Sequence, residues 1–216
     1  MEVYLLLKII SILSGIQAIR IIMKEIFFQF IRRSALNNDL ITIFQMILFT
    51  VIIFVICKKR NISLSIFPDI QSKSNKIGYF IITVIVLFFI ISTPVFNAGL
   101  SYEVIIPIIL STIATPIFEE LIFRGYVWNE FKHYHTNEFT VYIITTLLFA
   151  IWHLGYADSI WLKMTLMGYT TGFLFAMFMK VITGLCFGII IGLVRYKLKN
   201  CYATMLLHSF MNIFGR

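Results

Sequence analysis

Long apolar segments dominate this sequence, and their length restricts the folds that the chain can adopt. Hydrophobic residues make up 60% of the 216 positions and charged residues 13%, whereas soluble domains carry about 25% charged residues. An α-helix needs about 20 apolar residues to cross the hydrocarbon core, so we predict an all-α, polytopic membrane bundle of about seven or eight helices. The clearest predicted spans are residues 40–57, 77–96, 104–128 and 139–154.

Three further segments leave alternatives open. Residues 4–31 are apolar but are interrupted by charged residues such as Arg20, so they either span the bilayer or lie on it as an amphipathic helix. Residues 159–198 are long enough for two helices, divided near Lys180. One of these two is either a full crossing or a re-entrant or interfacial helix. Residues 202–214 are predicted to form a last, short helix.

Basic residues stand in short clusters between the apolar segments, for example at residues 58–60, and the net charge is +8. Such clusters are typical of cytoplasmic connectors, so we expect membrane lipids as partners and no nucleic acid. Connectors 58–76 and 129–138 are predicted inside, and 97–103 outside. Residues 195–199 are also basic and are predicted inside, but three full crossings after the third span would place them outside.

Three short patches put polar side chains inside otherwise apolar helices. Ionisable groups at the centre of a membrane helix cost about 2.5–3.5 kcal/mol each on insertion scales. A chain that keeps several of them is predicted to use them, which indicates an intramembrane active site. The patches read Glu119-Glu120-Leu-Ile-Phe-Arg124, Phe149-Ala-Ile-Trp-His153 and His208-Ser-Phe-Met-Asn212.

In the first patch, the two carboxylates are predicted to have different environments. Glu119 and Glu120 point about 100° apart on a helix. Glu120 lies four residues before Arg124 and can pair with it, either as support for a site or as a purely structural pair. Glu119 would then face a separate cavity and act as a general base toward water. Pro116 is expected to kink this helix, because it lacks a backbone N–H group.

The other two patches supply imidazoles. His153 lies on the same helix face as Phe149, and His208 shares a face with Asn212. A His-x-x-x-Asn face can stabilise an oxyanion, or it can be a polar contact between helices. Two mechanisms stay open: water is polarised directly by Glu119 and His153 without a cofactor, or Zn²⁺ is held by Glu119, His153 and His208.

These three motifs, in this order, resemble the signature of the CAAX protease and bacteriocin-processing family (CPBP or Abi), related to type II CAAX prenyl endopeptidases. The resemblance covers residues 105–212 and includes a helix with glycines at every fourth position. It implies an intramembrane endopeptidase in which Glu119 activates water, His153 assists, and His208 with Asn212 forms the oxyanion side. Glu120, Arg124 and Phe149 would support them. The family is conventionally called metalloprotease, which leaves the metal open.

We therefore divide one compact membrane domain into N-terminal helices of unassigned role, residues 1–103, and a catalytic core, residues 104–216. The expected substrate is a membrane-associated peptide or protein, reached from the cytoplasm of a bacterial cell. Bacteriocin or signal-peptide maturation and self-immunity are the implied roles. The alternatives are a non-proteolytic immunity or scaffold protein and a small proton-coupled transporter, although the inverted repeats typical of transporters are not evident. Trp128 and Tyr156 either line an entrance to the site or lie at the membrane interface, and the interface is the favoured assignment.

Overall fold

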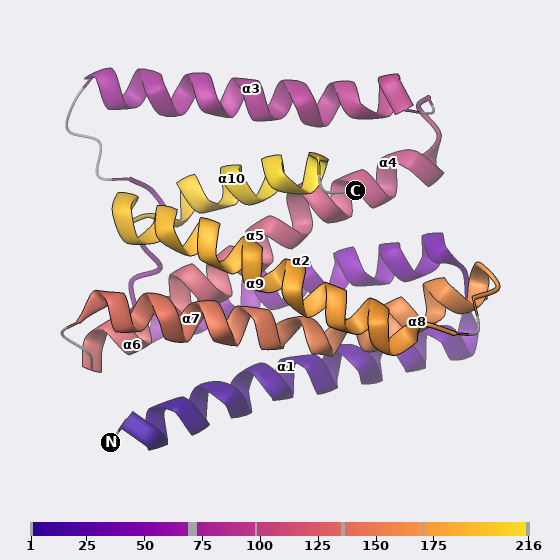
Figure 1. Cartoon of the computed structure of the whole chain (residues 1–216), viewed down its shortest axis with the longest axis horizontal. Helices are drawn as coiled ribbons and strands as arrows, with labels where there is room; N and C mark the ends of the chain where they lie inside the picture. The colour runs from indigo at the N-terminus through magenta and orange to yellow at the C-terminus, as the bar shows by residue number, and fades with distance from the viewer. Residues whose placement is uncertain (1, 69–72, 98, 135–136, 170, 215–216) are drawn as a thin grey trace.

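The computed structural model describes residues 2–68, 73–97, 99–134, 137–169 and 171–214, and in these residues all regular structure is helical (Figure 1). Within the described residues, six helical rods are long and apolar enough to cross a membrane. A seventh, shorter helix, α10, covers Cys201–Phe214. The predicted all-α, multi-pass membrane bundle is thereby confirmed. The six rods are Val3–Phe30, Ala35–Lys59, Asn75–Phe96, Tyr102–Tyr134, Glu138–Leu166 and Phe173–Leu198.

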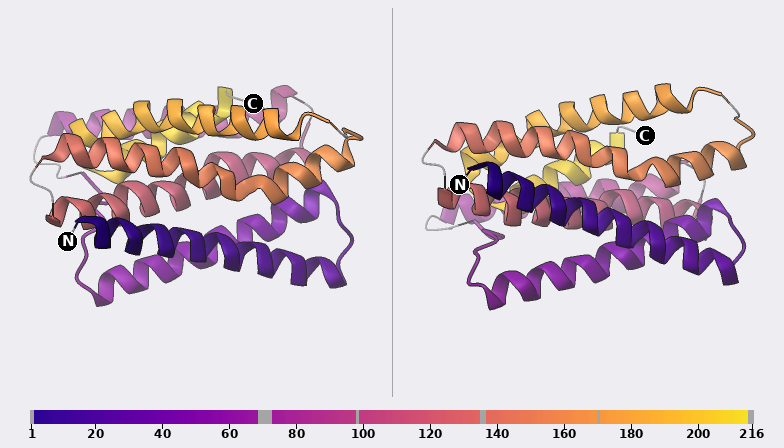
Figure 2. Two further views of the ribbon diagram at one scale, coloured as in Figure 1. Left: turned by 60° about the horizontal axis from the view of Figure 1, so that its bottom comes forward. Right: turned by 90° about the horizontal axis from the view of Figure 1, so that it is seen from below.

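The N-terminal segment forms helix α1, Glu2–Phe30, which runs along the bundle beside α2, Ala35–Lys59 (Figures 1 and 2). Leu5, Ile9 and Leu13 recur every four residues and are all buried in the core. This apolar stripe and the length of α1 favour the spanning alternative over an interfacial helix.

The third predicted span and the connector after it form one rod with two π-helical turns. The first turn, η1, covers Leu110–Ala114 and ends two residues before Pro116. The second, η2, covers Leu121–Val127 and carries Arg124. The irregularity predicted at Pro116 is therefore a widened turn, and such turns are frequent at functional sites. The regular parts of the rod are α4 Tyr102–Ile109, α5 Thr115–Glu120 and α6 Trp128–Tyr134.

The predicted division near Lys180 is wrong. Helix α7, Glu138–Trp152, continues through the 3₁₀ turn η3, His153–Tyr156, into α8, Ala157–Leu166, as one rod. The chain reverses between Gly168 and Gly172, whose φ angles of +79° and +85° suit glycine. Helix α9, Phe173–Leu198, then contains Lys180 and no such break near it.

After the third span the chain crosses the bundle twice and not three times. This resolves the conflict over the basic residues 195–199, which can now lie inside. The Lys199 ammonium pairs with the Glu138 carboxylate, so the start of α7 and the end of α9 lie together. The backbone N–H of Cys201 also donates to the carbonyl of Ser65, at 2.8 Å. Connectors 58–68 and 129–134 and residues 197–199 therefore share one end of the bundle, here called the basic end (Figure 1). Residues 69–72 of the first connector lie outside the described residues.

Close packing of α9 on α7 depends on a glycine stripe. A Cβ atom at Gly192 would lie 2.8 Å from Tyr142 Cε2, and one at Gly188 would lie 3.2 Å from Thr146 Cγ2. Helix α9 can approach α7 this closely only because these positions lack side chains. In Figure 2, the α1–α2 pair and α9 lie on opposite sides of the rod that carries the carboxylates.

Candidate active site

The three polar patches meet around one cavity of about 380 Å³. Four of the predicted site residues line it: Glu119, His153, His208 and Asn212. The other three, Glu120, Arg124 and Phe149, are fully buried behind them. Its remaining walls come mainly from the start of α2, from α8 and from the first part of α9, so the cavity lies in the half of the bundle away from the basic end.

A buried ion pair supports the site from behind. Arg124 Nε lies 3.4 Å from Glu120 Oε2, which confirms the predicted pairing four residues apart. The same guanidinium donates to the carbonyl of Gly188, at 3.3 Å, and stacks 4.2 Å from the centroid of the Phe149 ring. Arg124 thus ties the carboxylate rod to α9 and to α7.

The hydrogen bonds of the two imidazoles indicate their tautomers. His208 Nδ1 lies 2.9 Å from Glu120 Oε1, and His153 Nδ1 lies 2.8 Å from the carbonyl of Phe149. An ionised carboxylate and a carbonyl only accept, so Nδ1 of each ring carries the proton. Nε2 of each ring is then the nitrogen that is left for other contacts. In His208, Nε2 lies 3.9 Å from Glu119 Oε2.

One aromatic contact, with Phe149, and one close approach, of α9 at Gly184, fix the position of the His153 ring. The Phe149 ring packs against it in a T-shaped arrangement, with ring centroids 4.9 Å apart. A Cβ atom at Gly184 would lie 2.6 Å from His153 Nδ1, so α9 makes room for this imidazole only with a glycine. Phe149 also contacts the His208 ring, with centroids 6.0 Å apart, and so separates the two histidines from the protein core.

Glu119 presents its two carboxylate oxygens differently. Oε1 accepts a hydrogen bond of 2.7 Å from the Tyr156 hydroxyl, which itself accepts one of 3.1 Å from Trp152 Nε1. Oε2 has no hydrogen-bond partner among the described residues, although the side chain is 1% exposed. One oxygen is therefore anchored, and the other is buried beside the cavity without a hydrogen-bond partner among the described residues.

The interface assignment of Tyr156 and Trp128 is wrong. Tyr156 contacts Glu119 inside the site, and Trp128 is fully buried with the Arg195 guanidinium 5.2 Å from its ring. A signal for Tyr156 was present in the sequence: it lies three residues after His153, and residues at this spacing share a face of a 3₁₀ turn.

Asn212 holds α10 against η1. Its Nδ2 donates to the carbonyl of Ser111, at 2.7 Å. The amide group has two hydrogens, so one can make this structural contact while the other serves the cavity. The position of Asn212 is thus compatible with both roles that the sequence left open, a polar contact between helices and an oxyanion donor.

The N-terminal helices also contribute cavity walls, which the sequence did not indicate. Asn38, Asp39 and Thr42 of α2 line the cavity, and Asp39 pairs with Lys163 of α8 at 2.9 Å. Lys180 of α9 completes this polar mouth. The clue in the sequence was the polar Asn-Asn-Asp start of an otherwise apolar helix.

The zinc mechanism requires three ligands around one point. Within the described ranges, no three His, Cys, Asp or Glu side chains are grouped closely enough to hold a metal ion. In this arrangement Glu119, His153 and His208 are not grouped as a zinc site, so no catalytic step is assigned to a metal here.

Comparison with known protein families is consistent with this geometry. Residues 101–214, about half of the chain, match the family described as type II CAAX prenyl endopeptidase Rce1-like. The match contains all seven predicted site residues and leaves out α1, α2 and α3. No curated protein and no solved structure matches the chain.

Proposed function

Because the chain belongs to the type II CAAX prenyl endopeptidase Rce1-like family, we propose that it is an intramembrane endopeptidase that hydrolyses a peptide bond of a membrane-associated peptide or protein. The observation that carries this proposal is the buried carboxylate of Glu119, with Oε2 unpartnered within the described residues beside His208. Such a group in a cavity between helices is suited to activating water.

In the proposed mechanism, Oε2 of Glu119 takes a proton from a water molecule, which attacks the carbonyl carbon of the scissile bond. Nε2 of His153 accepts a second hydrogen bond from this water and orients it. The oxyanion is stabilised by the amide of Asn212 and by His208 when Nε2 is protonated. The proton on Glu119 then passes to the leaving nitrogen, the C–N bond breaks, and a carboxylic acid and an amine result. The acid then loses its proton to the amine or to solvent.

Three residues serve this chemistry without contacting the substrate. Glu120 and Arg124 hold His208 in place through the contact of Glu120 with His208 Nδ1. Tyr156 holds Oε1 of Glu119 and so directs Oε2 toward the water. Orientation of this kind contributes to catalysis because the reacting groups need not be ordered again in each turnover.

The substrate class follows from the position of the cavity between the helices of a multi-pass membrane protein. A peptide has to reach it from the bilayer or its surface, which favours a membrane-associated substrate. Maturation of a bacteriocin or a signal peptide, or self-immunity, in a bacterial cell is the role we propose. Membership of an endopeptidase family and the full set of polar motif residues favour this activity over a scaffold or a proton-coupled transporter.

The direct test is cleavage by the purified protein. Wild type in detergent would be incubated with peptides encoded by neighbouring genes, with and without a metal chelator, and the products identified by mass spectrometry. Cleavage that persists with the chelator supports water activation by Glu119, whereas loss that added Zn²⁺ restores would replace it with a metal mechanism. Absence of cleavage from every peptide, while the protein still confers its cellular phenotype, would favour the scaffold alternative.

The sequence predicts that the basic connectors lie in the cytoplasm and that the site is reached from the cytoplasm. These two expectations exclude each other. The cavity lies in the half opposite the basic end, so a cytoplasmic basic end places the cavity mouth on the outer face. We expect the charge rule to prevail. In a Cys186→Ser background, a membrane-impermeant thiol reagent added to intact cells should label Thr183→Cys at the cavity and not Lys59→Cys at the basic end.

The remaining cysteines should not interfere with this labelling. Cys57 and Cys201 are buried, and burial raises the pKa of the Cys201 thiol to about 12, so it stays unreactive at neutral pH. Labelling of Lys59→Cys alone would reverse the orientation and restore cytoplasmic access.

A further inference from the structure

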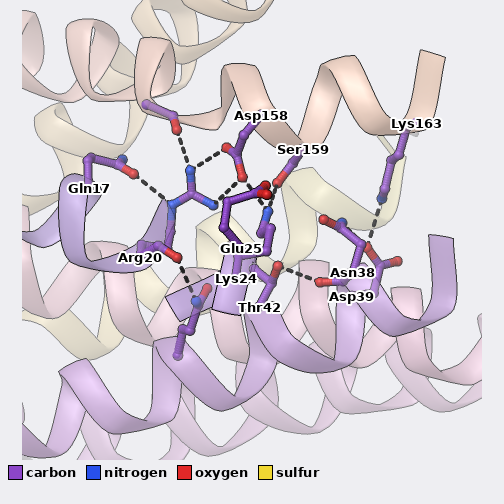
Figure 3. Close-up of polar contacts among 12 residues, drawn as sticks. Gln17, Arg20, Lys24, Glu25, Asn38, Asp39, Thr42, Asp158, Ser159 and Lys163 are labelled. Carbon is purple, nitrogen blue, oxygen red and sulfur yellow. Dashed lines mark hydrogen bonds and ion pairs between the residues drawn. The ribbon is translucent and has the colours of Figure 1, made fainter. Parts of the chain in front are cut away.

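The turn that carries His153 and Tyr156 is held by a residue outside the family match. Arg20 of α1 is 2% exposed and faces this turn (Figure 3). One guanidinium nitrogen, Nη2, donates both to the carbonyl of Gly155 and to the carboxylate of Asp158. Nη1 donates to the other oxygen of Asp158, at 3.2 Å. Arg20 thus grips the end of the turn and the start of α8 together.

Neighbouring polar groups of α1 and α2 fix Arg20 itself. Its Nε donates to Gln17 Oε1, at 2.8 Å (Figure 3). Its backbone carbonyl accepts from Gln45 Nε2, also at 2.8 Å. Lys24 provides a second cation to Asp158, at 2.6 Å. The guanidinium therefore has one defined orientation, set by two helices that precede the matched region.

Gln17 extends the clamp to the other end of the turn. Its amide nitrogen donates to the carbonyl of Trp152, at 3.3 Å. A Cβ atom at Gly155 would lie 2.2 Å from Gln17 Cδ, so the turn and α1 are in direct contact. Carbonyls at a change of helix type lack regular partners, and here α1 satisfies two of them.

The turn that Arg20 holds, η3, carries a residue that contacts the proposed general base, Glu119. Tyr156 is its last residue, its ring centroid lies 5.3 Å from the Arg20 guanidinium, and its hydroxyl donates to Glu119. His153 is the first residue of the same turn. A shift of η3 would move both groups relative to Glu119. Charged residues within membrane-spanning helices are costly. The connection from Arg20 through η3 to Glu119 gives the Arg20–Asp158 pair a function.

We propose that Arg20 is a positioning residue of the active site: by holding the Gly155 carbonyl and Asp158, it fixes the turn that directs Tyr156 to Glu119. The role in catalysis rests on the proposed function, whereas the clamp itself does not. The two parts can therefore be tested separately.

Hydrogen–deuterium exchange tests the clamp without a substrate. We expect Arg20→Gln to increase exchange of the amides of residues 153–158 in detergent, with little change in α9. The control is Arg33→Gln, because Arg33 pairs with Glu25 while both are about half exposed. If Arg20→Gln fails to fold, Asp158→Asn, which keeps the side-chain volume, and Arg20→Lys, which keeps the charge, replace it. Unchanged exchange in a folded variant overturns the proposal.

A double-mutant cycle tests the catalytic consequence. Misplacement of a catalytic group by about 1 Å can cost about 100-fold in rate, so we expect Arg20→Gln to lower kcat by about 10- to 100-fold with KM changed less than about threefold. If Arg20 acts through Tyr156, its substitution in a Tyr156→Phe background should cost much less than in wild type.

The outcomes separate this inference from the proposed function. Equal losses in both backgrounds would show that Arg20 does not act through Tyr156, and unchanged kcat in Arg20→Gln would exclude a positioning role, while wild-type cleavage would still support the endopeptidase. Conversely, if the wild-type protein cleaves no peptide, the proposed function fails, and increased exchange at residues 153–158 in Arg20→Gln would still establish the clamp.

Discussion

Glu119→Gln should reduce the kcat of peptide cleavage by about 10²–10⁴-fold, the usual contribution of a general base. Glutamine keeps the size of the side chain and an oxygen that can accept from Tyr156. It cannot take a proton from water, so the attacking hydroxide would no longer form at Oε2. Because proton transfer to Glu119 belongs to the chemical step and not to substrate binding, the loss should appear in kcat more than in KM.

The matched control for Glu119 is Glu103→Gln. Glu103 lies on the same helical rod, in the first turn of α4, and is exposed. We expect it to cleave like wild type. Both variants should elute from size-exclusion chromatography in detergent as the wild type does. A folded Glu119→Gln protein that keeps wild-type kcat would remove Glu119 from the mechanism.

Arg124→Ala should be the most destabilising single substitution at the site. Removing one partner of a buried ion pair costs about 3–5 kcal/mol, because the remaining charge is left uncompensated. Here Glu120 would remain fully buried, and the contacts of Arg124 with Gly188 and Phe149 would be lost as well. We expect a large decrease in the thermal unfolding midpoint in detergent and a low yield of folded protein.

Two comparisons isolate the buried charge as the cause. Arg33→Ala removes an exposed pair, and such pairs contribute about 0.2–1 kcal/mol. The double variant Glu120→Gln, Arg124→Met leaves no charge and keeps most of the volume, so it should unfold at a higher temperature than Arg124→Ala. Equal midpoints for the double variant and Arg124→Ala would assign the loss to packing instead.

The site as a whole could be predicted from the sequence only to the level of its motifs. Glu120 and Arg124 lie four residues apart, so helix geometry alone brings them together. The convergence of Glu119, His153 and His208 could be expected from the motifs, but the partners of each group could not. The Nδ1 contact of His208, for example, is made with Glu120, 88 residues away in the chain.

The connection after His153 shows why local patterns were insufficient. Residues 157–166 carry Asp158 and Lys163, so they read as polar and separate from the preceding span. In the structure these charges are paired with Arg20 and with Asp39, from helices far away in the sequence. Once paired, they can continue α7 as one rod, and the reversal moves to the two glycines that accept positive φ.

The sequence by itself determined the four clearest membrane spans, the helical class, the three motifs and the Glu120–Arg124 pair, because each depends on hydropathy or on the period of a helix. Only the tertiary structure decided that Tyr156 contacts Glu119 and that Arg20 holds the turn behind it. Arg20 and Asp158 are 138 residues apart, and a charge of this kind reveals its role only when packing shows which partner compensates for its burial.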